Sequence, residues 1–81
     1  MTITVLLFAG IAEKLGVRVL QVPWSEGDTI ERVRDRLVAD HPALSVFLPS
    51  VLYALNEEYV KPGHEVSAGD TLALIPPVSG G

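Results

Sequence analysis

The sequence contains no cysteine, and this constrains the fold more than any other feature of the chain. Disulfides, thiolate metal sites and cysteine nucleophiles are therefore excluded together. Since the chain has 81 residues, enough for one small domain, its fold must be stabilised by an apolar core alone. Hydrophobic residues make up 48% of the chain and charged residues 20%, which is the composition of an ordinary folded domain.

Short runs of β-branched and large apolar residues, separated by turn residues, predict a sheet. The expected strands are residues 3–8, 17–22, 51–56, 59–60 and 71–75. The first and the last are rich in aliphatic residues, so we expect them to be parallel neighbours in the middle of the sheet. On the first strand, Leu6 and Phe8 point away from the face that carries Leu7. They are covered either by a second layer or by a partner protein.

One clear helix is predicted to begin at Asp28. This residue type is a favourable N-cap, and Glu31 three positions later completes a capping-box pattern. Pro42 is predicted to end the helix. Apolar residues recur at helical spacing and form one stripe, namely Ile30, Val33, Leu37 and Val38. The charged residues are expected on the solvated side, namely Glu31, Arg32, Arg34, Asp35 and Arg36.

The connections add two short elements and one aromatic residue. Residues 10–15 are expected to form a helical turn that Gly16 ends, and residues 43–49 a loop or helical turn that tucks its apolar side chains inward. Trp24 lies in a turn segment, and we expect it to pack at the edge of the core. One helix packed across a mixed sheet of four or five strands satisfies these apolar faces, which predicts an α+β fold of the ubiquitin-like β-grasp type.

The last six residues, 76–81, are expected to form a flexible tail beyond a β-grasp domain that spans residues 1–75. Two prolines stop the last strand, because proline supplies no N–H to the ladder. Glycine has no Cβ, so Gly80 and Gly81 can pass through a channel too narrow for side chains. The α-carboxylate of Gly81 is then the group best placed for chemistry. The alternative is an ordinary disordered chain end, where glycine is common.

The side chains themselves offer little chemistry. A zinc site at His41 and His64 would need carboxylates to complete its ligands, so we expect no metal. Glu57 and Glu58 fall in a hairpin turn, where solvated carboxylates are expected rather than a general acid and base. Ser79 has no base held beside it, and no glycine pattern forms a phosphate cradle. The chain is therefore expected to bind no cofactor and to catalyse no reaction alone.

The charge balance favours a protein partner. Six Lys and Arg against ten Asp and Glu give a net charge of −4, which argues against nucleic acid and anionic membranes and for a partner with a basic face. No apolar run reaches the roughly 18 residues of a membrane span. Residues 1–4 show neither the basic region nor the cleavage site of an export signal, so a cytoplasmic location is expected.

Three segments carry a resemblance to a known family: VLLFA at residues 5–9, ALNEEYV at 54–60 and GDTLALIPPVSGG at 69–81. They resemble the small, sulfur-carrying subunit of molybdopterin synthase, and the similarity runs over essentially the whole chain. Two prolines, a small hydroxyl residue and a terminal glycine pair after a strand are its most specific part. Family members often have an arginine before the glutamate that here is Glu13. This chain has Ala12 there, which puts any contact through that arginine in question.

The resemblance implies a sulfur carrier. An activating enzyme similar to the ubiquitin-activating type would use ATP to adenylate the carboxylate of Gly81, next to Gly80, and a sulfur donor would convert the adenylate to a thiocarboxylate. The thiocarboxylate would give its sulfur to a cyclic pterin precursor in the large synthase subunit, within a complex of two copies of each subunit. The expected docking residues are Phe8, Ile75, Pro76, Pro77, Val78 and Ser79.

Two other functions stay open at this point. A related carrier for thiamine or another sulfur-bearing product would use the same tail chemistry. A ubiquitin-like modifier would instead join its tail to lysines of other proteins. The PPVSGG ending and the helical stretch at residues 44–48 favour the molybdopterin branch.

Overall fold

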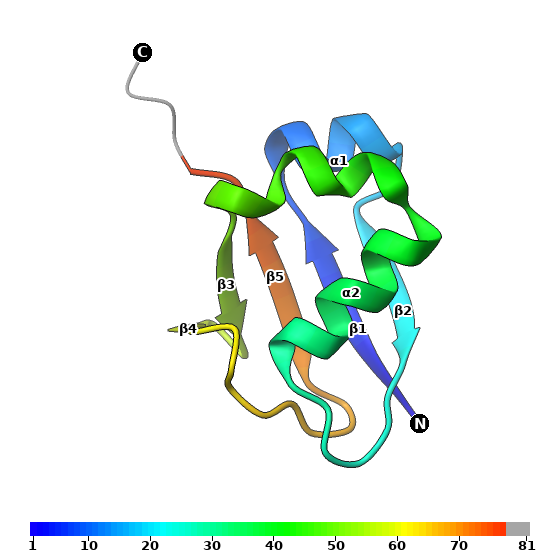
Figure 1. Ribbon diagram of the computed structural model, residues 1–81, viewed down its shortest axis with the longest axis vertical. Helices are drawn as coiled ribbons and strands as arrows, with labels where there is room; N and C mark the ends of the chain where they lie inside the picture. Colours follow the sequence, from blue (N-terminus) through cyan, green and yellow to red (C-terminus); the bar gives the residue numbers. More distant parts are fainter. Residues whose placement is uncertain (78–81) are drawn as a thin grey trace.

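Five strands form one mixed sheet in the order β2–β1–β5–β3–β4 (Figure 1). The computed structural model describes residues 1–77. The strands are β1 (Thr2–Leu7), β2 (Val19–Pro23), β3 (Leu52–Leu55), β4 (Glu58–Val60) and β5 (Thr71–Ile75). The central pair, β1 with β5, is parallel, and the other three pairs are antiparallel. Both the mixed sheet and its central parallel pair are as predicted.

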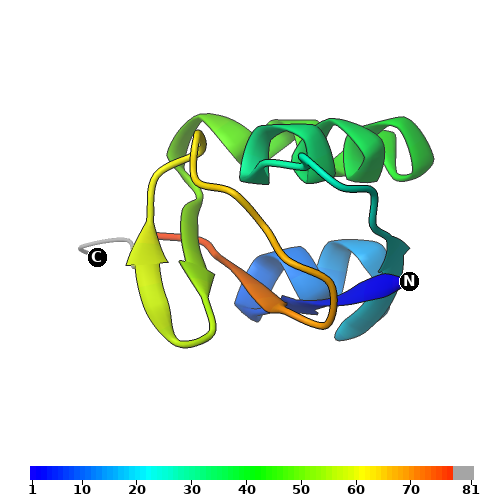
Figure 2. The same ribbon diagram turned by 90° about the horizontal axis from the view of Figure 1, so that it is seen from below.

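The helices are α1 (Ala9–Leu15), α2 (Ile30–Asp40) and two short 3-10 helices, η1 (Pro42–Val46) and η2 (Leu48–Ser50). In Figure 2, α2 and the 3-10 helices, in green, form a layer over one face of the sheet. Together with the sheet they make the predicted α+β fold with one main helix. No helix within residues 1–77 combines the length and hydrophobicity that a membrane crossing requires.

The core lies between the sheet and α2. Alternate residues of β1 point into it, so Ile3, Val5 and Leu7 are buried. The stripe predicted for α2 is also confirmed, since Ile30, Val33 and Leu37 are buried and Val38 is half-buried. Other segments complete the core with Ile11, Val22, Leu44, Tyr53, Leu55, Val66, Leu72 and Leu74. Every layer therefore contributes to one continuous core, as a domain without disulfides requires.

The connections follow the predictions in part. α1 ends at Gly16, whose φ of 75° is a left-handed conformation that glycine adopts without strain. The Trp24 side chain is half-buried against the core, and its Nε1–H donates to the carbonyl of Val66 at 2.7 Å. The second strand starts at Val19, two residues later than predicted, and extends to Pro23. Proline is tolerated there because β2 is an edge strand.

The predicted start of the main helix was wrong. The N-cap of α2 is Thr29, whose hydroxyl accepts from the N–H of Arg32 at 3.3 Å. Asp28 is instead buried and holds the loop before the helix, because its carboxylate accepts from the N–H of Ser25 at 2.9 Å and forms an ion pair with Arg36. Arg36 also donates to the carbonyl of Pro23 at 2.7 Å, so it faces this loop rather than the solvated side of α2.

This ion pair couples folding stability to pH. Hydrogen bonds from Arg36, and to a lesser extent from the Ser25 N–H, hold the pKa of Asp28 below its ordinary value of 3.8, although burial opposes the shift. A carboxyl whose pKa is lower in the folded chain than in the unfolded chain stabilises the fold at higher pH. That stabilisation is lost as the pH falls below 3.8 through the folded-state pKa.

Asp28→Asn should lower the free energy of unfolding by about 2 kcal/mol at pH 7, because a charged hydrogen-bond acceptor is lost from a buried position. Urea unfolding measures this effect. Asp35→Asn is the matched control, since its ion pair with Arg34 lies on the surface and should be worth less than about 1 kcal/mol. The difference between wild type and Asp28→Asn should shrink towards pH 3. A difference that grows on acidification would contradict the assignment.

Candidate functional site

The face of the sheet that is turned away from α2, here called the open face, keeps its side chains accessible. On β1 the core-facing residues are buried, whereas Thr4 and Leu6 are half-buried and Phe8, just after the strand, is 44% exposed. The same contrast occurs on the other strands, where Val19, Leu52 and Tyr59 are exposed. Large apolar side chains on an accessible face indicate a docking surface.

The register of the strands arranges the open face in rows. One row is polar, since Thr4 lies opposite Gln21 of β2 and Thr71 of β5. The Gln21 side chain donates to the Thr4 hydroxyl at 3.0 Å. This row lies towards the beginning of β1, and therefore away from the end of β5, because the two strands are parallel. This polar row offers little apolar surface to a binding partner.

The next row is apolar across the whole sheet. Leu6 lies opposite Val19 of β2 and Ala73 of β5. Ala73 lies opposite Ala54 of β3, which in turn lies opposite Tyr59 of β4. Paired residues on neighbouring strands project to the same face, so this row crosses all five strands.

A third row lies where β1 and β5 end. Ile75 is opposite Leu52 of β3, and Phe8 follows Leu7, the last residue of β1. The accessible members of the apolar row and of this last row together form what we call the apolar patch, which leaves out the buried Ala54: Leu6, Phe8, Val19, Leu52, Tyr59, Ala73 and Ile75. The patch therefore occupies the end of the open face from which the chain continues into Pro76.

The described part of the chain contains four of the site residues that the sequence predicted. Phe8 and Ile75 both lie in the last row of the patch, Pro76 is half-buried, and Pro77 is exposed. The 44% exposure of Phe8 favours a partner surface over a second core layer. Val78, Ser79, Gly80 and Gly81 lie outside the described residues, so their predicted roles stay predictions.

Three residues of the patch were not singled out from the sequence. Val19 is 53% exposed, Leu52 46% and Tyr59 72%, which makes them more accessible than Phe8. Each sits in a segment that has the sequence pattern of an ordinary strand. The signal that identifies them is the register, because cross-strand pairing with Leu6, Ile75 and Ala54 places them on the open face.

The body of the domain offers no cluster for metal chemistry within residues 1–77, where no three His, Asp or Glu side chains come close enough to share an ion. His41 lies at the end of α2, whereas His64 approaches the carbonyl of Glu65 through its Nδ1 at 2.7 Å. Glu57 and Glu58 are exposed at the β3–β4 turn, as the sequence predicted. Within these residues, the feature that remains for function is the apolar patch beside the end of β5, where the chain continues into Pro76.

Phe8→Ala should change the free energy of unfolding by less than about 1 kcal/mol, because the ring is largely outside the core. The neighbouring Leu7→Ala is the matched comparison and should cost about 3 kcal/mol, since Leu7 is buried. Urea unfolding of both variants at pH 7 provides the measurement. If the two losses are equal, Phe8 belongs to the core and not to a docking surface.

The sequence matches the ThiS family over residues 5–81. The molybdopterin synthase sulfur carrier subunit of Arabidopsis thaliana is 43% identical over 79 residues, which cover 98% of this chain and 82% of that protein. The corresponding subunit of Chlamydomonas reinhardtii is 39% identical over 83 residues and the alignment covers both chains completely. The resemblance stated from the sequence is thereby confirmed.

A third relative bears a different name. Small archaeal modifier protein 1 of Haloferax volcanii is 40% identical over 83 residues, which cover 93% of this chain and 95% of that protein. Its crystal structure superposes with a TM-score of 0.89 at 37% identity and covers both chains completely. Fold and sequence thus lead to one conclusion: the chain belongs to the ThiS family.

Proposed function

We propose that this chain is the sulfur carrier subunit of molybdopterin synthase. The observation that carries the proposal is the position of the apolar patch at the edge of the sheet from which Ile75 leads into the tail. A protein that docks on the patch receives the tail at the same time. Relatives at 39% to 43% identity that are named as this subunit support the assignment.

The proposed chemistry takes place on the main chain. The α-carboxylate of Gly81 attacks the α-phosphate of ATP, which an activating enzyme holds, and gives an acyl-adenylate and pyrophosphate. A sulfur donor then displaces AMP and leaves a thiocarboxylate on Gly81. No cysteine is needed, in keeping with a sequence that has none. The chain acts as a carrier and holds no cofactor of its own.

The second half of the cycle delivers the sulfur. The tail, with Val78 and Ser79 between the prolines and Gly80, enters the large synthase subunit and gives its sulfur to a cyclic pterin precursor. Two deliveries build the dithiolene that holds molybdenum. Since the activating enzyme and the large subunit must each accept the tail beside the same patch, we expect them to compete for this chain.

Deleting Gly81 should abolish sulfur transfer because the reacting carboxylate moves back by one residue. The fold should be unaffected, since the last strand ends at Ile75. The assay measures pterin conversion by the large subunit after activation with ATP and a sulfur source. One alanine appended after Gly81 should abolish transfer as well, whereas one alanine placed before Met1 is the matched control and should not. Transfer at the wild-type rate by the deleted protein would refute the proposal.

Phe8→Ala and Ile75→Asp should each weaken binding to the large subunit at least about tenfold, as expected when an apolar anchor at the centre of an interface is removed. Isothermal titration calorimetry gives the dissociation constants. Val46→Ala is the control, because Val46 is exposed and apolar but lies on η1, in the layer over the other face of the sheet. Similar dissociation constants for all three variants would show that the patch does not bind.

A second candidate function is that of a ubiquitin-like modifier. The observation that favours it is the 40% identity to a protein named small archaeal modifier protein 1. A modifier would form stable conjugates with lysines of other proteins, and these would require Gly81. Their appearance in cell extract, without pterin conversion by the purified carrier, would favour this function over sulfur delivery.

A further inference from the structure

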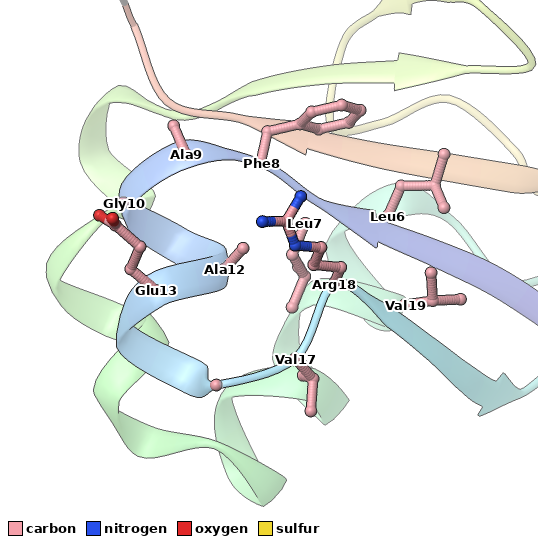
Figure 3. A pocket seen from close by; sticks show the side chains of 11 residues that line it. Leu6, Leu7, Phe8, Ala9, Gly10, Ala12, Glu13, Val17, Arg18 and Val19 are labelled. Carbon is pink, nitrogen blue, oxygen red and sulfur yellow. The ribbon is translucent and has the colours of Figure 1, made fainter.

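A hollow of about 770 Å³ lies next to the apolar patch, between the end of β1, α1 and the segment that leads into β2 (Figure 3). Its apolar walls come from Leu6, Phe8, Ala12, Val17 and Val19. Three of these residues, Leu6, Phe8 and Val19, also belong to the patch. The hollow is thus continuous with the proposed docking surface.

The hollow is wide because small residues stand where α1 and the following turn approach it. Ala12 contributes only a methyl group, and Gly16 at the C-terminal end of α1 contributes no side chain, with no heavy atom within 4 Å of where a Cβ would lie. Sites for small molecules usually enclose most of the ligand, whereas this hollow is open on its outer side (Figure 3). With this volume and one side open, the hollow has room for a protruding segment of a protein partner that is anchored by an apolar side chain.

Arg18 gives the hollow its charge. Its guanidinium group reaches in among Phe8 and Ala12, while the carboxylate of Glu13 points away (Figure 3). The ion pairs recorded within residues 1–77 involve only the arginines of α2, Arg34 and Arg36. A guanidinium that forms no ion pair with another residue of the described part of the chain offers a planar set of N–H donors that matches a carboxylate.

We propose that this hollow binds an apolar side chain of the large synthase subunit and that Arg18 pairs with a carboxylate beside that side chain. The inference rests on the proposed function and deepens it by naming the chemistry that the partner must present. We take the large subunit as the occupant because the hollow shares Leu6, Phe8 and Val19 with the patch on which that subunit docks in the proposed function. A buried apolar anchor surrounded by a polar rim is the usual arrangement at such an interface.

Arg18→Glu should weaken binding to the purified large subunit at least about tenfold. The affinity of Arg18→Lys should lie between those of wild type and Arg18→Glu, because lysine keeps the charge but not the paired N–H donors. The difference between Arg18→Glu and wild type should shrink as salt is raised, since exposed charges are screened. Arg32→Glu is the matched control. It makes the same change of charge on an exposed residue of α2, on the other side of the sheet, and should stay within about twofold of wild type.

A second variant tests the hollow independently of charge. Ala12→Met places a longer side chain into it and should also weaken binding at least about tenfold, while the exposed outer side of the hollow leaves room for the side chain in the free protein. Circular dichroism and urea unfolding establish that each variant is folded.

The inference requires both effects. Equal binding by Arg18→Glu and Arg32→Glu, or wild-type binding by Ala12→Met, would overturn it while leaving the proposed function intact. Failure of the wild-type chain itself to bind the large subunit would overturn the proposed function and this inference with it.

Discussion

The parallel pairing of β1 with β5 is the interaction on which the rest of this structure depends. It runs from Thr4 opposite Thr71 to Leu7 opposite Leu74, and backbone hydrogen bonds of Thr4 with Asp70 and of Gly69 with Thr2 continue it beyond the strand. Parallel strands end at the same edge of a sheet. Phe8, which follows β1, and Ile75, the last residue of β5, therefore lie at the same edge of the sheet, although they are far apart in the sequence.

Side chains of β1 alternate between the face that packs against the core and the face that carries the proposed docking surface. Ile3, Val5 and Leu7 support α2 from one face, and Leu6 and Phe8 remain on the other. A shift of register by a single residue would exchange the two sets, so the core that stabilises the domain also fixes the position of the apolar patch. Stability and docking are separated by face rather than by distance along the chain.

Sequence patterns were sufficient where the determining interactions are local or periodic. The spacing of Ile30, Val33 and Leu37 predicted the buried stripe of α2, and the aliphatic content of the first and last strands predicted their central pairing. The same reasoning failed at the start of α2. Asp28 has the sequence pattern of an N-cap, but its carboxylate pairs with Arg36, which lies eight residues later on α2. Thr29 caps the helix instead.

The docking surface was predictable only in part. Phe8 and Ile75 could be identified as apolar residues left over from the core. The contributions of Val19, Leu52 and Tyr59 depend on which residue faces which across three strand pairs, and a single sequence does not determine that register. The hollow at Arg18 depends on the approach of α1 to the beginning of β2, which is a tertiary relationship. The residues of the tail from Val78 onward keep the roles that the sequence and its relatives suggest.

The central claim is that the reactive atom of this protein is carried on the carboxyl group of Gly81. The most direct test is the intact mass of the chain after incubation with ATP, the activating enzyme and a sulfur source, with pyrophosphate release confirming that activation has occurred. The account predicts a mass increase equal to the replacement of one oxygen by sulfur, located in the C-terminal peptide. An unchanged mass despite pyrophosphate release, or an increase located on a side chain of the folded body, would contradict it.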